Sequence, residues 1–420
     1  MGLNRCKGCS DLPPEAMARF RLIEGVFRGC CLKWGYQEVR TPTLEYLHLF
    51  TATGTLTPDM LGRVYSFLDW DGWSGERVVL RPDGTIPIAR LYIDSLKERG
   101  LARLFYVVNT FIFEETGTKA RERWQCGAEL IGGSSVIANV ELISLALEVL
   151  ERLGFRDVEV RLCHAGLIRA LLARLELSPG EQERLFDQLL DGDVAVLARL
   201  KADKPELVKA LALLLEMRGK SSGFLKNIKA LIGREATEFD SPLADFMATT
   251  DLLEALGTNY QIDLASGRGF EYYTGMIFHL FIGDENVGGG GRYDALIPLM
   301  GGPETPAAGF ALYLDHLMNL AGPEASAKSQ PGKRVLILAK PETVREAFAI
   351  ARQLRQAGYV ACFSLDGGQT GDYGWTIDVR DKEAGFILTD LASNKMFKVQ
   401  TTGEVLARLG GKDDAQDSPA

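Results

Sequence analysis

A long helical stretch, from about residue 165 to residue 256, interrupts a region of the chain whose other segments are typical of β-strands. Inside this stretch, the run Ser178-Pro179-Gly180-Glu181 has the spacing of a capping box with proline at the first helical position. Strand patterns precede it at 104–110 and 125–131, and they return from 260 to 282. The sequence therefore predicts an α+β domain that carries a helical insert at about 165–256.

Two helices are expected beside these strands. Between Pro13 and Trp34 the apolar residues recur at helical spacing, and Asp11 and Pro13 supply start signals. The second helix has its apolar face between Val136 and Leu150, and Gly154 marks its end.

A separate C-terminal part is indicated by a change in composition. The core is expected to end near residue 325, because 326–332 is a linker rich in Pro, Gly and Ser. Residues 333–410 favour a small α/β domain, with a strand at 335–339, a helix at 342–357 and a strand at 360–365. The segments 386–389 and 397–401 favour further strands, and the acidic, polar tail 411–420 is expected to be disordered.

The composition is that of an ordinary globular protein, with 46% hydrophobic and 25% charged residues. No stretch approaches the roughly 20 unbroken apolar residues that a membrane span needs. The first ten residues are polar and contain no apolar signal region. We therefore expect a cytoplasmic protein that does not contact a membrane.

Cysteine and histidine do not form a ligand pattern. The seven cysteines are too few for a disulfide framework in 420 residues, and Cys6 and Cys9 form a single Cys-x-x-Cys without a second pair at zinc-site spacing. Free thiols at a chance spacing are favoured over a metal site, and the four histidines are scattered. No metal is therefore expected.

Nucleotide cofactors and nucleic acids are also disfavoured. The chain contains no P-loop, and the four-glycine run Gly288–Gly291 does not continue with the spacing of a dinucleotide site, so no cofactor is expected. Taken alone, the glycine run is more often a tight turn. A net charge of -9 argues mildly against a nucleic-acid partner, since polyanions are held mainly by Lys and Arg.

Several short runs resemble one protein family in the same order. From about residue 8 to residue 320 the chain resembles the histidyl-tRNA synthetases. The specific part of this signal is RGFEYYTG together with GGRYD. The matching runs are Gly8–Pro14 (GCSDLPP), Gly35–Glu45 (GYQEVRTPTLE), Leu80–Thr85 (LRPDGT), Phe111–Gly127 (FIFEETGTKARERWQCG), Arg268–Gly275 (RGFEYYTG), Gly290–Asp294 (GGRYD) and Gly309–Leu317 (GFALYLDHL).

This resemblance implies a class II aminoacyl-tRNA synthetase-like fold, an antiparallel sheet flanked by helices. It also implies a dimer, because Pro42 matches the motif 1 proline that lies at the dimer interface of that family. Residues 333–410 then look like a degenerate anticodon-binding domain. That part has 11 Lys or Arg and 9 Asp or Glu. A tRNA-binding face usually shows a clearer basic excess, so no specific tRNA binding is expected.

A histidine-binding pocket is implied by the same resemblance. Free histidine needs acceptors for its ammonium, a cation for its carboxylate, and polar groups for the two imidazole nitrogens. The residues carried over to these roles are Asp83, Thr85 and Gln125 for the ammonium, Arg268 for the carboxylate, Glu129 and Tyr273, with Tyr272 beside it, for the imidazole, and Gly290 and Gly291 for close backbone approach.

One of these residues departs from the family pattern. The family has Glu where this chain has Asp83, which is shorter by one methylene, so weaker histidine binding is expected. Each residue by itself also has an ordinary explanation, since a lone strand carboxylate is more often solvated and a lone tyrosine more often packs. Their occurrence together, in family order, favours the binding site.

Two arginines that handle ATP in the family are replaced. The motif 2 arginine position is Ile112, and the motif 3 arginine position is His316. An apolar side chain cannot donate to phosphate, and a histidine lacks the forked donor geometry of arginine. Losing one such donor typically costs about a hundred- to thousand-fold in rate, so adenylate formation is expected to be very slow.

Retained amino-acid ligands beside lost ATP ligands predict a sensor with no catalytic residues of its own. The chain is similar to a known family of histidyl-synthetase-like proteins that assemble with a short catalytic ATP phosphoribosyltransferase in histidine biosynthesis. Members of that family are required for its activity, and they relay feedback by L-histidine. Two alternatives stay open: an active but divergent histidyl-tRNA synthetase, and a synthetase-like protein with another amino acid or another partner.

Overall fold

The structure is a computed structural model that describes residues 5–52, 61–69, 75–113, 120–175, 177–190, 195–199, 208, 212, 215, 217–232, 237–264, 272–322, 334–365, 373–381 and 385–410. It divides into two compact units, Met1–Pro323 and Glu324–Ala420, each of which is considered by itself. The expected carboxylate ligand Arg268, the expected linker 326–332 and the expected tail 411–420 lie outside the described residues.

A nine-stranded sheet is the centre of the first unit. Its strand order is β1-β5-β6-β12-β11-β10-β7-β9-β8. Every neighbouring pair from β5 to β7 in that order is antiparallel, whereas the β1–β5 and β7–β9 pairs are parallel. The expected α+β class with a mainly antiparallel sheet is thereby confirmed. The strands are β1 (Gln37–Glu38), β5 (Ala102–Phe111), β6 (Glu122–Ile131), β7 (Val158–His164), β8 (Arg218–Gly219), β9 (Tyr260–Asp263), β10 (Met276–Ile282), β11 (Glu285–Arg292) and β12 (Ala307–Tyr313).

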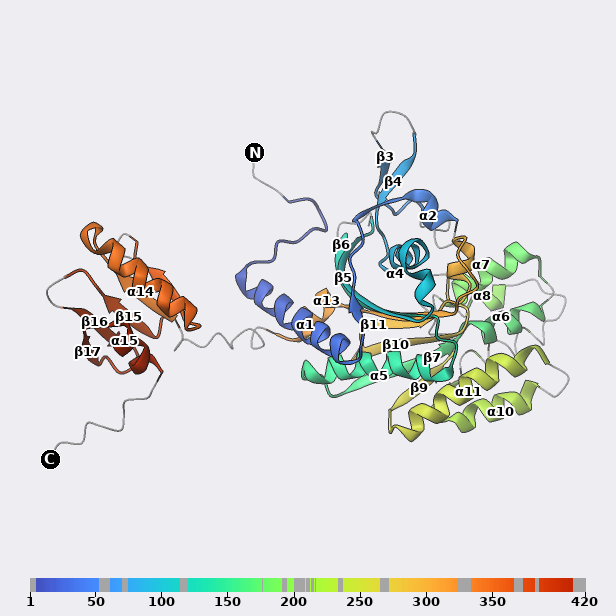
Figure 1. Cartoon of the computed structure of the whole chain (residues 1–420). Coiled ribbons are helices and arrows are strands. Elements are labelled where there is room, and N and C mark those ends of the chain that lie inside the picture. Colours follow the sequence, from blue (N-terminus) through green and yellow to red (C-terminus); the bar gives the residue numbers. More distant parts are fainter. Residues whose placement is uncertain are drawn as a thin grey trace. The chain divides into compact units, whose positions relative to one another are not determined.

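Helices lie on both faces of this sheet (Figure 1). Helices α1 (Pro14–Lys33), α5 (Val136–Arg152) and α13 (Leu314–Leu320) pack together on one face. On that face Phe310 contacts Phe27 and Phe278 edge-on or tilted, with ring centroids 6.5 Å and 6.4 Å apart. Helix α4 (Thr85–Leu91) lies on the other face, in the concavity of the sheet, and α12 (Leu296–Leu299) packs against it.

The strand register decides which side chains meet on the α4 face. Successive side chains of a strand point to opposite faces, whereas residues paired across strands share a face. Glu129 of β6 pairs with Gly309 of β12, and Gln125 pairs with Tyr313. Tyr106 of β5 pairs with Gly127 of β6, between these two positions. These three neighbouring strands therefore present one continuous row of polar and glycine positions to α4.

The segment between β7 and β9 carries helices α6 (Ala165–Ala173), α7 (Pro179–Leu190), α8 (Val196–Arg199), α10 (Ser222–Ile232) and α11 (Asp240–Ala255). At its start, the His164 side chain caps α6 by accepting a hydrogen bond from the Leu167 N–H at 3.3 Å. The other ring nitrogen of His164 lies 3.3 Å from Asp245 of α11. His164 is thus a packing residue that joins two helices of this segment.

A small three-stranded sheet stands apart from the large one in the same unit. Its order is β2-β4-β3, with β2 (Leu44–Tyr46), β3 (Ser66–Leu68) and β4 (Arg77–Leu80). The short helix α2 (Leu47–Thr51) follows β2, and α4 continues into a π turn at Tyr92–Leu96 and a 3-10 turn at Lys97–Arg99. A further 3-10 turn at Thr237–Phe239 leads into α11.

The C-terminal unit is a five-stranded mixed sheet of order β14-β13-β15-β16-β17. Strand β13 is parallel to both of its neighbours, and the remaining pairs are antiparallel. Among the residues that the structure describes in this unit, the buried core includes Val335, Ile350, Leu354 and Leu388. The elements are β13 (Arg334–Leu338), a 3-10 turn (Pro341–Thr343), α14 (Val344–Gln356), β14 (Val360–Phe363), β15 (Trp375–Asp378), β16 (Phe386–Asp390), β17 (Met396–Val399) and α15 (Thr402–Leu409).

Within the described ranges, none of the helices combines the length and the apolar character that crossing a bilayer requires.

Candidate functional site

A buried carboxyl group, that of Glu129, is the centre of the candidate site. Its side chain projects from β6 on the α4 face of the sheet and is 1% exposed. The Thr85 hydroxyl at the start of α4 donates to Glu129 Oε1 at 2.8 Å, and the Tyr106 hydroxyl donates to the same oxygen at 3.0 Å. The Tyr293 hydroxyl donates to Oε2. Three donors from three separate segments therefore hold one carboxyl group in place.

Two glycines create the space for this arrangement. A Cβ at Gly309 would lie 1.7 Å from Glu129 Oε2, which is far inside van der Waals contact. A Cβ at Gly127 would lie 2.2 Å from the Tyr106 ring. Any larger residue at either position would displace the group that it meets, so these glycines allow the polar cluster to sit directly on the sheet.

Burial sets the protonation of this cluster. It raises the pKa of Glu129 from 4.5 to about 8, although the hydrogen bonds from Tyr293, Thr85 and Tyr106 lower it, and the nearby Asp83 raises it further. Burial also raises the pKa of the Tyr106 and Tyr293 hydroxyls well above the ordinary value, so both remain protonated donors. At neutral pH burial therefore favours a protonated Glu129.

Asp83 is the second buried acid of the site. Its carboxylate accepts from the Ile86 N–H at 2.9 Å, in the first turn of α4. Burial raises the pKa of Asp83 from 3.8 to about 6, while hydrogen bonds from the Ile86, Gly84 and Thr85 N–H groups lower it. Asp83 is therefore mostly ionised at neutral pH, and it gives the site a negative charge suited to an ammonium group.

A cavity of about 50 Å³ lies above these acids. The Gln125 side-chain oxygen is buried and has no hydrogen-bond partner among the described residues. A buried acceptor without a donor is costly, and a ligand ammonium or N–H group would satisfy it. The cavity is lined by Asp83, Thr85, Gln125, Tyr272, Tyr273, His279, Gly289, Tyr293, Gly309, Phe310, Ala311 and Tyr313.

Tyrosine rings form one wall of the cavity. Tyr272 contacts Tyr273 edge-on, with ring centroids 5.1 Å apart, and contacts Tyr293 in the same way at 5.5 Å. Edge-to-face packing holds aromatic rings in fixed orientations. The wall therefore places aromatic faces and hydroxyl groups around the space above Glu129.

The structure brings most of the predicted ligands together. Asp83, Thr85, Gln125, Tyr272 and Tyr273 line the cavity, and Glu129 bonds to Thr85 beneath it.

The two predicted glycines, Gly290 and Gly291, lie toward opposite faces of the sheet. A Cβ at Gly291 would lie 2.8 Å from the Tyr273 ring, whereas a Cβ at Gly290 would meet Gly309 and Phe310, which places it toward the α1 face. Among the glycines of β11, the one that lines the cavity is the neighbouring Gly289.

Several residues of the site were not predicted. One of them, Tyr106, donates to Glu129, and the others line the cavity: His279, Gly289, Tyr293, Gly309, Phe310, Ala311 and Tyr313. Tyr293 stood inside the GGRYD signature, so that signature was the available signal. The same signature also supplies structure. Arg292 is buried and donates to Asn139 at 3.0 Å and to Asp294 at 3.0 Å. It therefore ties β11 to the start of α5, on the other side of the sheet.

The two replaced arginine positions lie near the ends of strands. Ile112 directly follows β5, and its N–H donates to the Arg121 carbonyl at 3.0 Å. His316, in the first turn of α13, has its Nδ1 2.5 Å from the Glu285 carboxylate, and its ring contacts Tyr313. Neither side chain offers the forked guanidinium donors that hold a phosphate.

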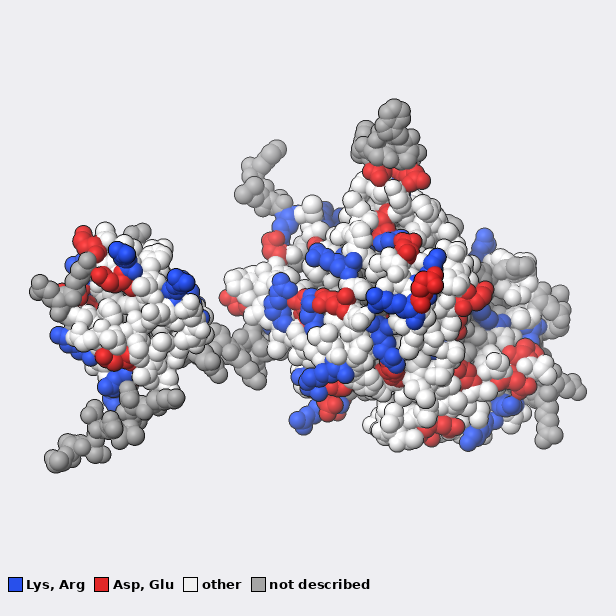
Figure 2. Space-filling model, viewed as in Figure 1, with Lys and Arg blue, Asp and Glu red and all other residues white. Residues whose placement is uncertain are grey.

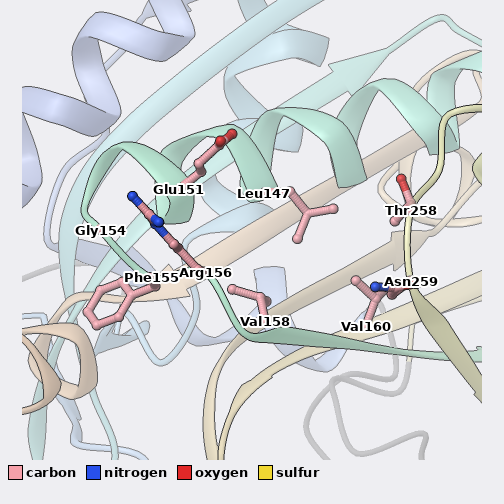
Figure 3. Close-up of a pocket in the computed structure, with 9 residues that line it drawn as sticks. All are labelled: Leu147, Glu151, Gly154, Phe155, Arg156, Val158, Val160, Thr258 and Asn259. Carbon is pink, nitrogen blue, oxygen red and sulfur yellow. The ribbon is translucent and has the colours of Figure 1, made fainter.

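A larger cavity of about 620 Å³ lies at the far end of α5, and it contains none of the predicted ligands (Figure 3). It is lined by Leu147, Glu151, Arg156, Val158 and Thr258, among others. Its lining mixes apolar and charged groups, and the described acids around it form no network like that of Glu129. Size alone therefore does not identify the functional site of this molecule.

The part of the chain that the structure describes contains no group of three or more His, Cys, Asp or Glu side chains placed to hold a metal ion.

A curved antiparallel sheet with a buried polar pocket on its concave face is the core of the class II aminoacyl-tRNA synthetases. The family model described as histidyl-tRNA synthetase matches residues 8–317. A histidine–tRNA ligase from Methanosarcina acetivorans is 32% identical over 434 residues, which cover 99% of this chain and 100% of that protein. A solved histidyl-tRNA synthetase from Nostoc has the same fold, with a TM-score of 0.74 at 18% identity over 98% of this chain and 99% of that one.

Other relatives are more similar. An ATP phosphoribosyltransferase regulatory subunit from Dehalococcoides mccartyi is 57% identical over 411 residues, which cover 98% of this chain and 99% of that protein. A crystal structure described as an ATP phosphoribosyltransferase regulatory subunit/histidyl-tRNA synthetase, from Bacillus halodurans, has a TM-score of 0.76 at 28% identity, and covers 91% of this chain and 99% of that one. The chain belongs to the family of ATP phosphoribosyltransferase regulatory subunits, within the histidyl-tRNA synthetase-like proteins.

Proposed function

We propose that this chain is a non-catalytic regulatory subunit of ATP phosphoribosyltransferase, the enzyme of the first step of histidine biosynthesis. It assembles in the cytoplasm with a short catalytic subunit, is required for that subunit's activity, and relays feedback inhibition by L-histidine. The observation that carries the proposal is the 57% identity, over 411 residues, to a protein named as such a subunit. The pocket around Glu129 supports the histidine part of it.

Histidine fits the chemistry of this pocket in one orientation. Asp83 and the Gln125 oxygen accept from the ammonium, together with Thr85. Glu129 and Tyr273 take the two imidazole nitrogens, and the Tyr106 and Tyr293 hydroxyls fix the Glu129 carboxylate. By resemblance to the synthetases, Arg268 pairs with the ligand carboxylate.

Binding requires the pocket to change. Its cavity of about 50 Å³ is smaller than the roughly 300–1,000 Å³ of ordinary ligand sites, so side chains must move to admit histidine. A ligand shifts a conformational equilibrium only if it binds one state better than the other. A pocket that opens for histidine supplies this difference, and a typical coupling would be about 1–3 kcal/mol.

Synthetase activity is proposed to be lost. Adenylate formation builds charge on phosphoryl oxygens that preorganised arginines stabilise. At the two corresponding positions the chain has the apolar Ile112 and His316, whose ring lies against the Glu285 carboxylate. Because each missing donor costs about a hundred- to thousand-fold, their joint absence leaves little activation of histidine.

Two assays done side by side test this function. Histidine-dependent ATP–pyrophosphate exchange is expected to be at least about 10⁴-fold slower than that of the Methanosarcina acetivorans ligase at equal concentration. Mixed with a short catalytic ATP phosphoribosyltransferase, the same preparation is expected to switch on phosphoribosyl transfer, and histidine should then inhibit it.

The alternatives give different results in these assays. Exchange at the rate of the active ligase would assign the chain as a divergent synthetase. Activation of the partner without any response to histidine, in a screen of the twenty amino acids by thermal shift, would point to another ligand. No activation at all would contradict the regulatory function.

Specific binding of tRNA is not part of the proposal. The C-terminal residues 333–410 carry 11 basic and 9 acidic residues, so their net charge is close to zero. On the face seen in Figure 2, this unit shows both signs and no continuous basic area. Nucleic-acid binding usually depends on such an area, because phosphate contacts supply most of the affinity.

We also propose that the chain forms a dimer through the region around Pro42. The small sheet beside it exposes apolar side chains on one face, with Leu44 48%, Tyr46 41% and Phe67 43% exposed. Tyr46 and Phe67 both pair with Val78 of β4, so they stand in one row across the sheet. An apolar row of this kind is suited to burial against a second copy.

Light scattering is expected to give a dimer mass at micromolar concentration. Tyr46→Asp should shift the population toward monomer, because it places a charge in the apolar row. Leu252→Asp is the matched control, since Leu252 is 37% exposed on α11, outside this sheet. A monomer in the unmodified chain, or equal effects of both variants, would contradict an interface at this sheet.

A further inference from the structure

Cys6 and Cys9 occupy the two ends of a tight turn. The Cys9 N–H donates to the Cys6 carbonyl at 3.2 Å, which closes a four-residue turn. Gly8, the third residue of the turn, has a φ of 78°. A positive φ at this position, with glycine there, is the signature of a type II β-turn. The Cys-x-x-Cys spacing in the sequence is therefore also a proximity in space.

This geometry matches what a disulfide needs. In a β-turn the Cα atoms of the first and fourth residues are less than about 7 Å apart. Bridged cysteines usually have Cα atoms about 4.4–6.8 Å apart. A bond between Cys6 and Cys9 can thus form without unfolding the turn that already brings them together.

These two thiols are also far more accessible than most of the others. Cys6 is exposed and Cys9 is half-buried, whereas Cys30, Cys31, Cys126 and Cys163 are buried. Burial raises the pKa of all four buried thiols, which keeps them protonated and unreactive. Cys362 is partly exposed, but it belongs to the C-terminal unit and not to the unit that contains Cys6 and Cys9. Among the cysteines of the first unit, Cys6 and Cys9 are therefore the two that an oxidant in solution can reach.

The turn is attached to the hairpin that leads to the candidate site. The Gly8 carbonyl accepts from the Arg121 N–H at 2.7 Å, and the Arg121 carbonyl accepts from the Ile112 N–H at 3.0 Å. Arg121 directly precedes β6, the strand that carries Gln125 and Glu129. A covalent bond between Cys6 and Cys9 would restrict the motion of the turn, and therefore of the Gly8 carbonyl that accepts from Arg121 at the start of β6.

We propose that Cys6 and Cys9 form a reversible disulfide with a small-molecule disulfide as the oxidant. One cysteine thiolate attacks the oxidant, forms a mixed disulfide and releases one small thiol. The second cysteine thiolate then attacks the mixed disulfide at the protein sulfur, forms the Cys6–Cys9 bond and releases the second small thiol. Two protein thiols are oxidised, the oxidant is reduced to two thiols, and a dithiol reductant reverses the exchange.

A tryptic digest gives a direct readout, because trypsin cuts after Lys7, between the two cysteines. The full chain is equilibrated with oxidised glutathione, remaining thiols are blocked with a maleimide, and the digest is analysed by mass spectrometry without reduction. The expected result is the Cys6-Lys7 fragment linked to the peptide that begins at Gly8. Reduction should separate the two fragments.

Three variants and a gel make the outcome decisive. Cys6→Ser and Cys9→Ser should each abolish the linked species, while Cys362→Ser should leave it unchanged. The chain should run as a monomer on a non-reducing gel, because the bond lies within one copy. Stable glutathione adducts on single cysteines, a dimer band that carries the link, or free thiols after equilibration would each overturn the proposal.

Amide hydrogen exchange reports the structural consequence. The Arg121 N–H should exchange more slowly in the oxidised chain than in the reduced one, and Cys9→Ser should remove this difference. A Cys6–Cys9 disulfide without any change at Arg121 would overturn the link between the turn and the hairpin. The site would then be a surface dithiol that is not coupled to the fold.

Discussion

Replacing Glu129 by glutamine is expected to weaken histidine binding about 10- to 100-fold at pH 8, the largest loss from any single conservative change in the pocket. Hydrogen bonds to a charged group contribute about 1.5–3 kcal/mol, and every 1.4 kcal/mol is tenfold in affinity. Glutamine keeps the size of the side chain, and its oxygen can still accept from Tyr293 or Thr85. The change therefore removes the charge that meets the imidazole N–H.

Isothermal titration calorimetry with histidine measures this loss. Glu98→Gln is the matched control, since Glu98 is exposed on a 3-10 turn outside the pocket, and its affinity should equal that of the unmodified chain. The Glu129→Gln chain should still activate the catalytic subunit, but with feedback inhibition shifted to about 10- to 100-fold higher histidine concentration. Equal affinity of both variants would remove Glu129 from the binding site.

Much of the large sheet was predictable, because its strands are long. The patterns at 104–110 and 125–131 correspond to β5 (Ala102–Phe111) and β6 (Glu122–Ile131), and the helix expected from Pro13 to Trp34 is α1 (Pro14–Lys33). Strands of ten residues and helices of 17 to 20 residues are long enough to leave a clear apolar pattern in the sequence. The apolar pattern of each of these elements follows from its packing in or against the large sheet.

Short elements of the C-terminal unit left weaker signals. Strand β15 (Trp375–Asp378) was not predicted, because four residues after a run of Gly and Asp show too little alternation. Helix α15 (Thr402–Leu409) was also missed, and its N-cap residue Thr401 was assigned to the expected strand 397–401. Its capping signal was present, since the Thr401 hydroxyl accepts from the Glu404 N–H at 3.3 Å, as in a capping box.

The pocket shows what local pattern leaves open. Tyr106 was missed because an aromatic residue inside a strand normally indicates core packing. Its role depends on the register that sets Gly127 opposite its ring, and on Glu129 two residues further along β6. Tyr293 donates to Glu129 although the two residues are 164 positions apart in the chain. Cross-strand register of this kind cannot be derived from the composition of either segment.

The free energy of unfolding is expected to depend strongly on pH through the same carboxyl group. Burial raises the pKa of Glu129 from 4.5 to about 8, so the folded state holds this proton more tightly than the unfolded chain does. Its stabilising contribution is complete below pH 4.5 and is lost as pH rises toward 8. Since each pKa unit corresponds to about 1.4 kcal/mol, the unmodified chain should lose about 3 kcal/mol relative to Glu129→Gln between pH 5 and pH 8.

Urea unfolding of both proteins at pH 5 and pH 8 isolates this contribution, because all other titrating groups are shared and cancel in the difference. Four of the five tryptophans lie within residues 1–323, so their fluorescence reports mainly the unit that contains the pocket. A difference that does not change with pH would mean that Glu129 is already ionised at pH 5. If the difference does grow toward pH 8, ionisation of the buried Glu129 destabilises the fold at a pH where a bound histidine could stabilise the charge. Ligand binding and fold stability then depend on the same proton, which gives a regulatory subunit a means to respond to its effector.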